Sequence, residues 1–143
     1  MLTLLDLSAA FDCVDHHTLL QRLCTSYGLG EKVINWFKSY LSDRTQQVRT
    51  ATSSSMPSAV DFGVPQGLQG PILFLLYTAD LLQLVKRYYL KPQAYADDTQ
   101  IYGHCQPSDA GCLAQRVAFC ISEVSAWTKA NRLQLNLAKT EDL

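Results

Sequence analysis

Three aspartates stand where segments of strand-like composition end or meet. Asp6 interrupts the apolar run 2–7, and Asp97 and Asp98 are flanked by aromatic and β-branched residues rather than by a solvated run of charges. An ionised carboxylate buried without a partner costs several kcal/mol, and adjacent carboxylates repel each other, so these side chains need a cation. If the fold brings them together, they form an all-oxygen site suited to Mg²⁺, with Mn²⁺ as a substitute.

Such a site has a definite chemistry. Two Mg²⁺ ions about 3.5–4 Å apart can activate an attacking hydroxyl and stabilise a leaving pyrophosphate during an in-line phosphoryl transfer. This is polymerase chemistry in outline, and it requires Asp6 and Asp97 to lie close enough to share a cation. Each aspartate also has a simpler explanation, because Asp6 can cap a turn and an Asp-Asp pair is ordinary at the tip of a hairpin.

The pattern of apolar residues predicts the elements that must position these aspartates. Residues 2–7 read as a strand buried on both faces. Helices are predicted over residues 18–24, 31–41, 71–85 and about 109–131, and a polar edge strand over 44–50. Residues 93–96 and 99–102 read as a hairpin joined at Asp97 and Asp98, and 133–137 as one more strand. This order predicts an α+β fold with helices on one face of a largely antiparallel sheet.

Length and composition narrow the class of protein. The chain has 143 residues, of which 48% are hydrophobic and 17% charged, and its net charge is −1. This describes one globular domain and excludes a disordered segment, while the charge by itself names no partner. Five cysteines without C-x-x-C spacing suggest neither disulfides nor a zinc site. With no signal peptide or membrane span visible, we expect an intracellular protein that makes no membrane contact.

Four segments occur in the order found in reverse transcriptases of non-LTR (LINE-type) retrotransposons, and the chain resembles the palm of these enzymes. The segments are LDLSAAFDCVDH at 5–16, GVPQG with GPILF at 63–74, YADD at 95–98, and LNLAKTE at 135–141. Residues 36–48 add to the likeness, which therefore covers essentially the whole chain. The resemblance implies a partial reverse transcriptase domain over residues 1–143, with fingers and thumb outside it. It also implies a location in the nucleus or the cytoplasm.

The resemblance also implies roles for individual residues. Asp6 and Asp97 would bind two Mg²⁺ ions, and Asp98 would support them. Phe11 matches an aromatic residue that excludes a ribose 2′-hydroxyl, although its spacing alone favours core packing. Lys139 matches a lysine near the triphosphate, although a solvated charge explains it equally well.

Pro65, Gln66 and Gly67 match the loop that lines the nucleotide and template pocket. Here Pro65 to Pro71 is one residue shorter than the family's P-Q-G-S-V-L-G-P and lacks the serine after Gly67. The implied function is RNA-directed DNA synthesis by two-metal nucleotidyl transfer on an RNA template, a DNA primer and deoxynucleoside triphosphates, with residues 1–143 inactive by themselves. The alternative is a catalytically silent remnant that serves at most as a binding module.

Overall fold

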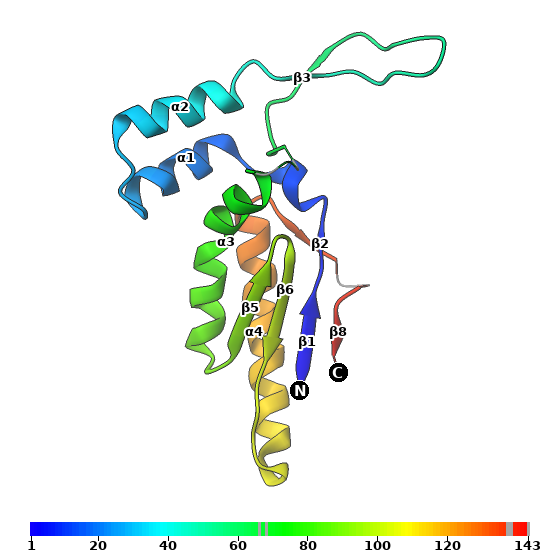
Figure 1. The fold of residues 1–143 in the computed structure, drawn as a ribbon. Coiled ribbons are helices and arrows are strands. Elements are labelled where there is room, and N and C mark those ends of the chain that lie inside the picture. The colour runs from blue at the N-terminus through cyan, green and yellow to red at the C-terminus, as the bar shows by residue number, and fades with distance from the viewer. Residues whose placement is uncertain (66, 68, 137–138, 143) are drawn as a thin grey trace.

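The computed structural model describes residues 1–65, 67, 69–136 and 139–142. Residues 141 and 142 are described by their backbone alone. Figure 1 shows a small sheet with long helices against it and shorter helices at one end. The helices are α1 (His16–Thr25), α2 (Glu31–Leu41), α3 (Gly70–Arg87) and α4 (Ala110–Ala130), with 3₁₀ turns η1 (Ala10–Cys13) and η2 (Pro107–Asp109). Mixed helices and antiparallel strands agree with the predicted α+β class.

Among the described residues, the main sheet has four antiparallel strands in the order β5-β6-β1-β8. These strands are β1 (Leu2–Leu5), β5 (Lys91–Tyr95), β6 (Asp98–Tyr102) and β8 (Glu141–Asp142). β1 pairs with β6 so that Leu5 lies opposite Thr99. Two further pairs are β2 (Leu7–Ser8) with β7 (Gln134–Leu135), and β3 (Thr45–Gln46) with β4 (Ser58–Ala59).

The two faces of the main sheet have different surroundings. Thr3, Leu5, Thr99 and Ile101 are buried on the face that carries α3 and α4, as alternation along a strand requires. The other face is open and carries the alternate residues of each strand. β1 is therefore buried on one face only, which corrects the prediction of a strand buried on both faces.

The helices begin and end where local chemistry requires. Asp15 caps α1 by accepting a hydrogen bond from the Thr18 amide at 2.8 Å. Pro71 stands in the first turn of α3, where its missing N–H costs nothing.

Phe74 and Tyr77 of α3 are the largest fully buried side chains and form the centre of the core. None of the described helices is long and apolar enough to cross a membrane.

The observed strands differ from the predicted ones in their bounds. The predicted strand 2–7 is divided into β1 and β2, and of the predicted strand 133–137, whose residue 137 lies outside the described residues, the structure has β7. The hairpin turns at Ala96 and Asp97, with Asp98 as the first residue of β6, so the turn lies one residue earlier than predicted. The predicted strand 44–50 is reduced to β3, and the chain from 45 to 59 forms a long narrow arm that projects from the body. We call residues 45–59 the arm.

Candidate active site

Asp6 lies where the first strand breaks. β1 ends at Leu5 and β2 begins at Leu7, so the chain leaves its partners β6 and β8 at Asp6 and pairs with β7 instead. The Asp6 carbonyl accepts a hydrogen bond from the Asn136 amide at 2.9 Å, which fixes the backbone at this break. The carboxylate is thereby held at a strand end and is 35% exposed.

The β5–β6 hairpin carries the other two aspartates. Its two-residue turn places Ala96 at φ 53°, in the left-handed region that two-residue hairpin turns require. Asp97 is the second turn residue, and Asp98 pairs with Tyr95 at the start of β6. The hairpin therefore presents both carboxylates at the same end of the sheet.

Asp6 and Asp98 share the open face of the sheet. Leu4 lies opposite Gln100 in the β1–β6 register. Side chains two residues apart along a strand point to the same face, so Asp6 and Asp98 are expected on the open face with Leu4 and Gln100. They line one surface depression of about 400 Å³. Its other lining residues are Leu4, Leu5, Thr99, Gln100 and Lys139. Asp97, which the structure also describes, is not among the residues that line it.

Lys139 completes the depression from the C-terminal segment. Its Nζ lies 4.0 Å from Oδ2 of Asp6, and its amide donates to the Asn136 carbonyl at 3.1 Å. The lysine side chain is 71% exposed, so this ion pair contributes little to stability. Its position instead gives the depression both charge signs: two carboxylates that can hold a cation and an ammonium that can hold a phosphate.

The residues of the depression fit a magnesium ion in part. Within residues 1–65, 67, 69–136 and 139–142, no three or more His, Cys, Asp or Glu side chains stand close enough to hold a metal together. The three-carboxylate cluster that the sequence suggested is thus not assembled as such. Asp6 and Asp98 remain as hard oxygen donors facing one space, and one or two carboxylates plus substrate phosphates commonly suffice for Mg²⁺.

Phe11 is held against the loop that follows Gly63. Its ring packs on Phe74 at 5.3 Å between centroids, and its carbonyl accepts from the Val64 amide at 2.8 Å. Gly63 has φ 84°, and a Cβ there would come 2.9 Å from Cα of Asp12, so only glycine permits this close approach. Phe11 is partly buried against the core, which supports its packing role and leaves its role as a sugar gate a prediction.

The predicted nucleotide loop follows directly. Pro65 is partly buried and Gly67 is exposed, while Gln66 lies outside the described residues. A Cβ on Gly70 would overlap the Pro65 carbonyl oxygen, so the loop folds back tightly on the start of α3. The Gly63 carbonyl also accepts from His16 Nε2 at 2.7 Å and from Arg44 Nη1 at 3.0 Å. Sequence reasoning missed this bond of His16, because its partner lies 47 residues along the chain.

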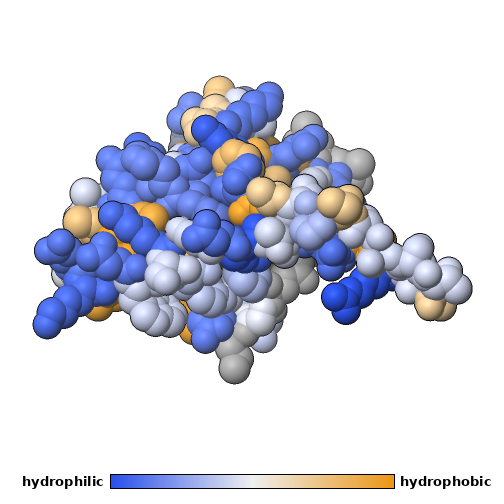
Figure 2. Space-filling model, turned by 90° about the horizontal axis from the view of Figure 1, so that it is seen from above, coloured by the Kyte–Doolittle hydropathy of each residue, from blue (hydrophilic) through white to orange (hydrophobic). Residues whose placement is uncertain are grey.

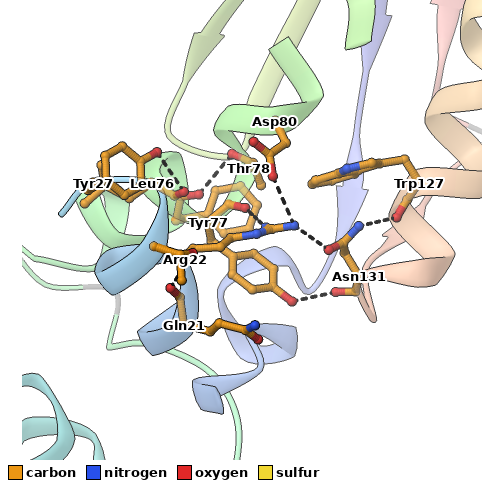
Figure 3. A network of polar contacts seen from close by, with 11 residues as sticks. Gln21, Arg22, Tyr27, Leu76, Tyr77, Thr78, Asp80, Trp127 and Asn131 are labelled. Atoms are coloured by element: carbon orange, nitrogen blue, oxygen red, sulfur yellow. Dashed lines mark hydrogen bonds and ion pairs between the residues drawn. The ribbon is translucent and has the colours of Figure 1, made fainter. Parts of the chain in front are cut away.

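Arg22 forms a network that sequence reasoning missed entirely (Figure 3). From α1, its guanidinium donates to the Tyr77 carbonyl and, at 2.7 Å, to Oδ1 of Asn131, and it lies 3.6 Å from Asp80. Its guanidinium carbon also lies 4.9 Å from the centre of the Tyr77 ring and 5.5 Å from that of Trp127. The network ties α1 to α3 and to the end of α4. The sequence signal that could have predicted this network is one arginine among the apolar residues of the predicted helix 18–24.

Asp15 forms a second polar link near the loop. Its carboxylate accepts from the Thr18 hydroxyl at 2.8 Å and lies 3.1 Å from Nη1 of Arg132. Burial raises the pKa of this carboxyl, but the hydrogen bonds from Thr18 and the positive charge of Arg132 outweigh it, so the pKa lies below its ordinary value. Asp15 therefore stays ionised at neutral pH and acts as a structural anchor.

Comparison with known proteins identifies the class to which this arrangement belongs. The family model described as "Reverse transcriptase (RNA-dependent DNA polymerase)" matches residues 1–143. The chain belongs to the reverse transcriptase family.

One relative adds a more particular likeness. The chain is 32% identical over 149 aligned residues to the "Probable RNA-directed DNA polymerase from transposon BS" of Drosophila melanogaster. The alignment covers 95% of this chain and 15% of that protein. The chain thus spans a small part of its relative's length, and the relative's own name places it in a transposon.

Proposed function

We propose that this chain is the palm of an RNA-directed DNA polymerase from a non-LTR retrotransposon. The observation that carries the proposal is the depression at the broken end of β1, where Asp6, Asp98 and Lys139 face one space. Membership of the reverse transcriptase family supplies the reaction class. The substrates would be an RNA template, a DNA primer and deoxynucleoside triphosphates, with fingers and thumb supplied from outside residues 1–143.

Each residue has a proposed part in the reaction. From the family resemblance, Asp6 and Asp97 would hold the metal ions, with Asp98 supporting them. In this structure Asp98 lines the depression with Asp6, and Asp97 stands next to Asp98 in the hairpin turn. Bound Mg²⁺ would supply the charge that stabilises an in-line phosphoryl transfer. The exposed Lys139 ammonium would bind phosphate oxygens of the nucleotide, releasing its ion pair with Asp6. Phe11, Pro65, Gln66 and Gly67 would form the pocket for the sugar and the template base.

A titration of the chain with Mn²⁺ and a deoxynucleoside triphosphate, followed by calorimetry, tests the proposal. We expect Asp6→Asn and Asp97→Asn each to weaken Mn²⁺–nucleotide binding about tenfold or more, because each removes a charged ligand. Asp109→Asn, which removes the same charge at the start of α4, is the control and should bind as wild type does.

The same titration decides the second candidate, a catalytically silent remnant. The specific observation in its favour is that, among the described residues, no three metal-binding side chains come together. Equal binding by the wild type, Asp6→Asn and Asp97→Asn would contradict the polymerase proposal and support a remnant that acts at most as a binding module.

A further inference from the structure

The arm is the most exposed segment of the chain. Every residue from 45 to 59 is exposed, and Figures 1 and 2 both show the arm leaving the body as a narrow projection. An extended leg of about seven residues reaches roughly 20 Å. Such a segment adds little to the core, so its ordered shape needs another explanation.

The arm is a preformed hairpin rather than a loose loop. β3 and β4 pair at its base, and further out the Ser55 amide donates to the Val48 carbonyl at 2.9 Å. At the tip, the Thr50 amide donates to the Ser53 carbonyl at 2.8 Å. A preformed arm loses little conformational entropy when it binds a partner, which favours a role in recognition.

The charge of the arm differs from that of the rest of the chain. The arm, residues 45–59, contains one basic residue, Arg49, and no acid; Arg44 precedes it, and the nearest acids in the sequence are Asp43 and Asp61. Ten of the fifteen arm residues are Arg, Gln, Ser or Thr, whose side chains donate hydrogen bonds to phosphate and sugar oxygens. Within the described part of the chain, the Arg49 side chain makes no hydrogen bond or ion pair and is free to bind an anion.

The base of the arm is fixed to the predicted nucleotide loop. Arg44 donates to the Gly63 carbonyl at 3.0 Å, and its own carbonyl accepts from the Val60 amide at 2.9 Å. The Gly63 amide donates in turn to Val14, next to the turn that carries Phe11. A ligand gripped by the arm would therefore be held in a set position relative to Phe11 and Pro65.

We propose that the arm binds the sugar–phosphate backbone of the template–primer duplex, with Arg49 contacting a phosphate. This inference rests on the proposed polymerase function and adds a duplex-binding element outside the carboxylate depression. Charge complementarity favours a polyanion over a protein partner, because the arm has only two large apolar side chains, Val48 and Met56, that are strongly exposed.

The salt dependence of duplex binding tests the inference. Fluorescence anisotropy with a labelled RNA–DNA heteroduplex is measured from about 50 to 200 mM salt on the full chain. Losing one phosphate contact should weaken binding by Arg49→Ala roughly tenfold at low salt and lower the slope of log K against log salt by about one. Arg87→Ala removes the same charge at the far end of α3 and should match the wild type.

A second variant replaces residues 47–57 by Asn-Gly, a favoured two-residue hairpin turn that leaves the β3–β4 pair closed. It should weaken binding at least as much as Arg49→Ala. Equal binding by wild type and Arg49→Ala would overturn the inference. So would a loss on shortening the arm with the salt slope unchanged, because the contact would then be apolar. Failure of the polymerase proposal is read separately, from the Mn²⁺ titration of the aspartate variants.

Discussion

Gly70 shows how closely the predicted nucleotide loop is packed. A methyl group at this position would overlap the Pro65 carbonyl oxygen, whereas at Gly111 it would meet nothing within 4 Å. We expect Gly70→Ala to lower the free energy of unfolding by about 2 kcal/mol, because the loop must move away from α3. Gly111→Ala, the matched control in α4, should raise it by about 0.5 kcal/mol.

Urea unfolding followed by circular dichroism measures both changes. If Gly70→Ala leaves the free energy of unfolding unchanged, the loop can move away from α3 without cost. That result would also weaken the assignment of Pro65 and Gly67 to a preformed pocket.

Asp15 predicts how stability changes in acid. Its pKa is lower in the folded chain than in the unfolded one, so it stabilises the fold above the unfolded value of about 3.9. That contribution is lost as the pH falls through the lower, folded-state pKa. Asp15→Asn keeps the helix cap and removes the titration, so its free energy of unfolding should fall less than that of wild type between about pH 5 and pH 2.

Unfolding by urea at a series of pH values checks this expectation. Asp43→Asn is the control, because it removes one carboxylate from an exposed residue with positive φ, a conformation that Asn tolerates. If the free energy of unfolding falls equally in acid for the wild type and Asp15→Asn, the ion pair between Asp15 and Arg132 does not contribute measurably to stability.

At the level of residues, sequence reasoning found acids that the fold places at one end of the sheet, while their role in metal binding stays a prediction and Asp97 does not line the depression. Asp6 and Asp98 were predictable from their types and their strand-like neighbours, and both line the depression. The contacts of His16 and Arg22 were not predictable, because each bonds a residue far along the chain. The spacing of apolar residues indicates which side of a helix or strand faces the core. It does not indicate which distant carbonyl group a polar side chain will bond.

Among the elements, Arg22 is the main polar link between helices. We expect Arg22→Ala to lower the free energy of unfolding by about 3 kcal/mol, because the Tyr77 carbonyl oxygen and Oδ1 of Asn131 lose their donor. Arg22→Lys should recover less than half, since an ammonium cannot reproduce the planar fork. Chemical denaturation measures both, and Arg87→Ala should change stability by less than about 0.5 kcal/mol.

If Arg22→Lys were as stable as wild type, a simple charge at this position would suffice. The link between α1, α3 and α4 would then depend on attraction to Asp80 rather than on hydrogen-bond geometry.

The cysteines of the helices predict a labelling pattern. Burial raises the pKa of the Cys120 thiol to about 11, whereas Cys24 and Cys112 are exposed. Thiolates are the reactive form, so Cys120 should resist iodoacetamide at neutral pH until the chain unfolds. Mass spectrometry of the labelled peptides checks this. Modification of Cys120 as fast as of Cys112 would mean that α4 leaves the core under native conditions.

The long helices were predictable as elements because their apolar residues repeat at helical spacing. The helix predicted over 31–41 is observed as α2, and α3 extends the prediction 71–85 by a turn or less at each end. The hairpin turn and the arm were predicted less well. Two adjacent aspartates favour a turn at either of two registers, and a polar segment such as 44–50 has no apolar face to mark its strand ends.

For the molecule as a whole, we expect residues 1–143 by themselves not to extend a primer measurably. The depression lies on an open sheet face, and a net charge of −1 gives little long-range attraction for nucleic acid. Transfer needs the primer hydroxyl within about 3–3.5 Å of the phosphorus, and little on this face would hold it there. The assay uses poly(A) with oligo(dT) and Mg²⁺ or Mn²⁺, with Asp97→Asn as control.

Extension by the wild type and not by Asp97→Asn would contradict this expectation. It would also show that residues 1–143 contain everything that the transfer needs.

The edge of the main sheet determines how the chain behaves when it is concentrated. β5 is an outer strand, and an unpaired edge of five residues can template pairing with another molecule. Pro92 stands inside this strand and has no N–H to offer a neighbouring chain, and Lys91 beside it adds a charge. Pro92 thus hinders aggregation through the open edge of the β5–β6 hairpin. The carboxylates at the turn of this hairpin stay accessible because other copies of the chain cannot readily pair beside it.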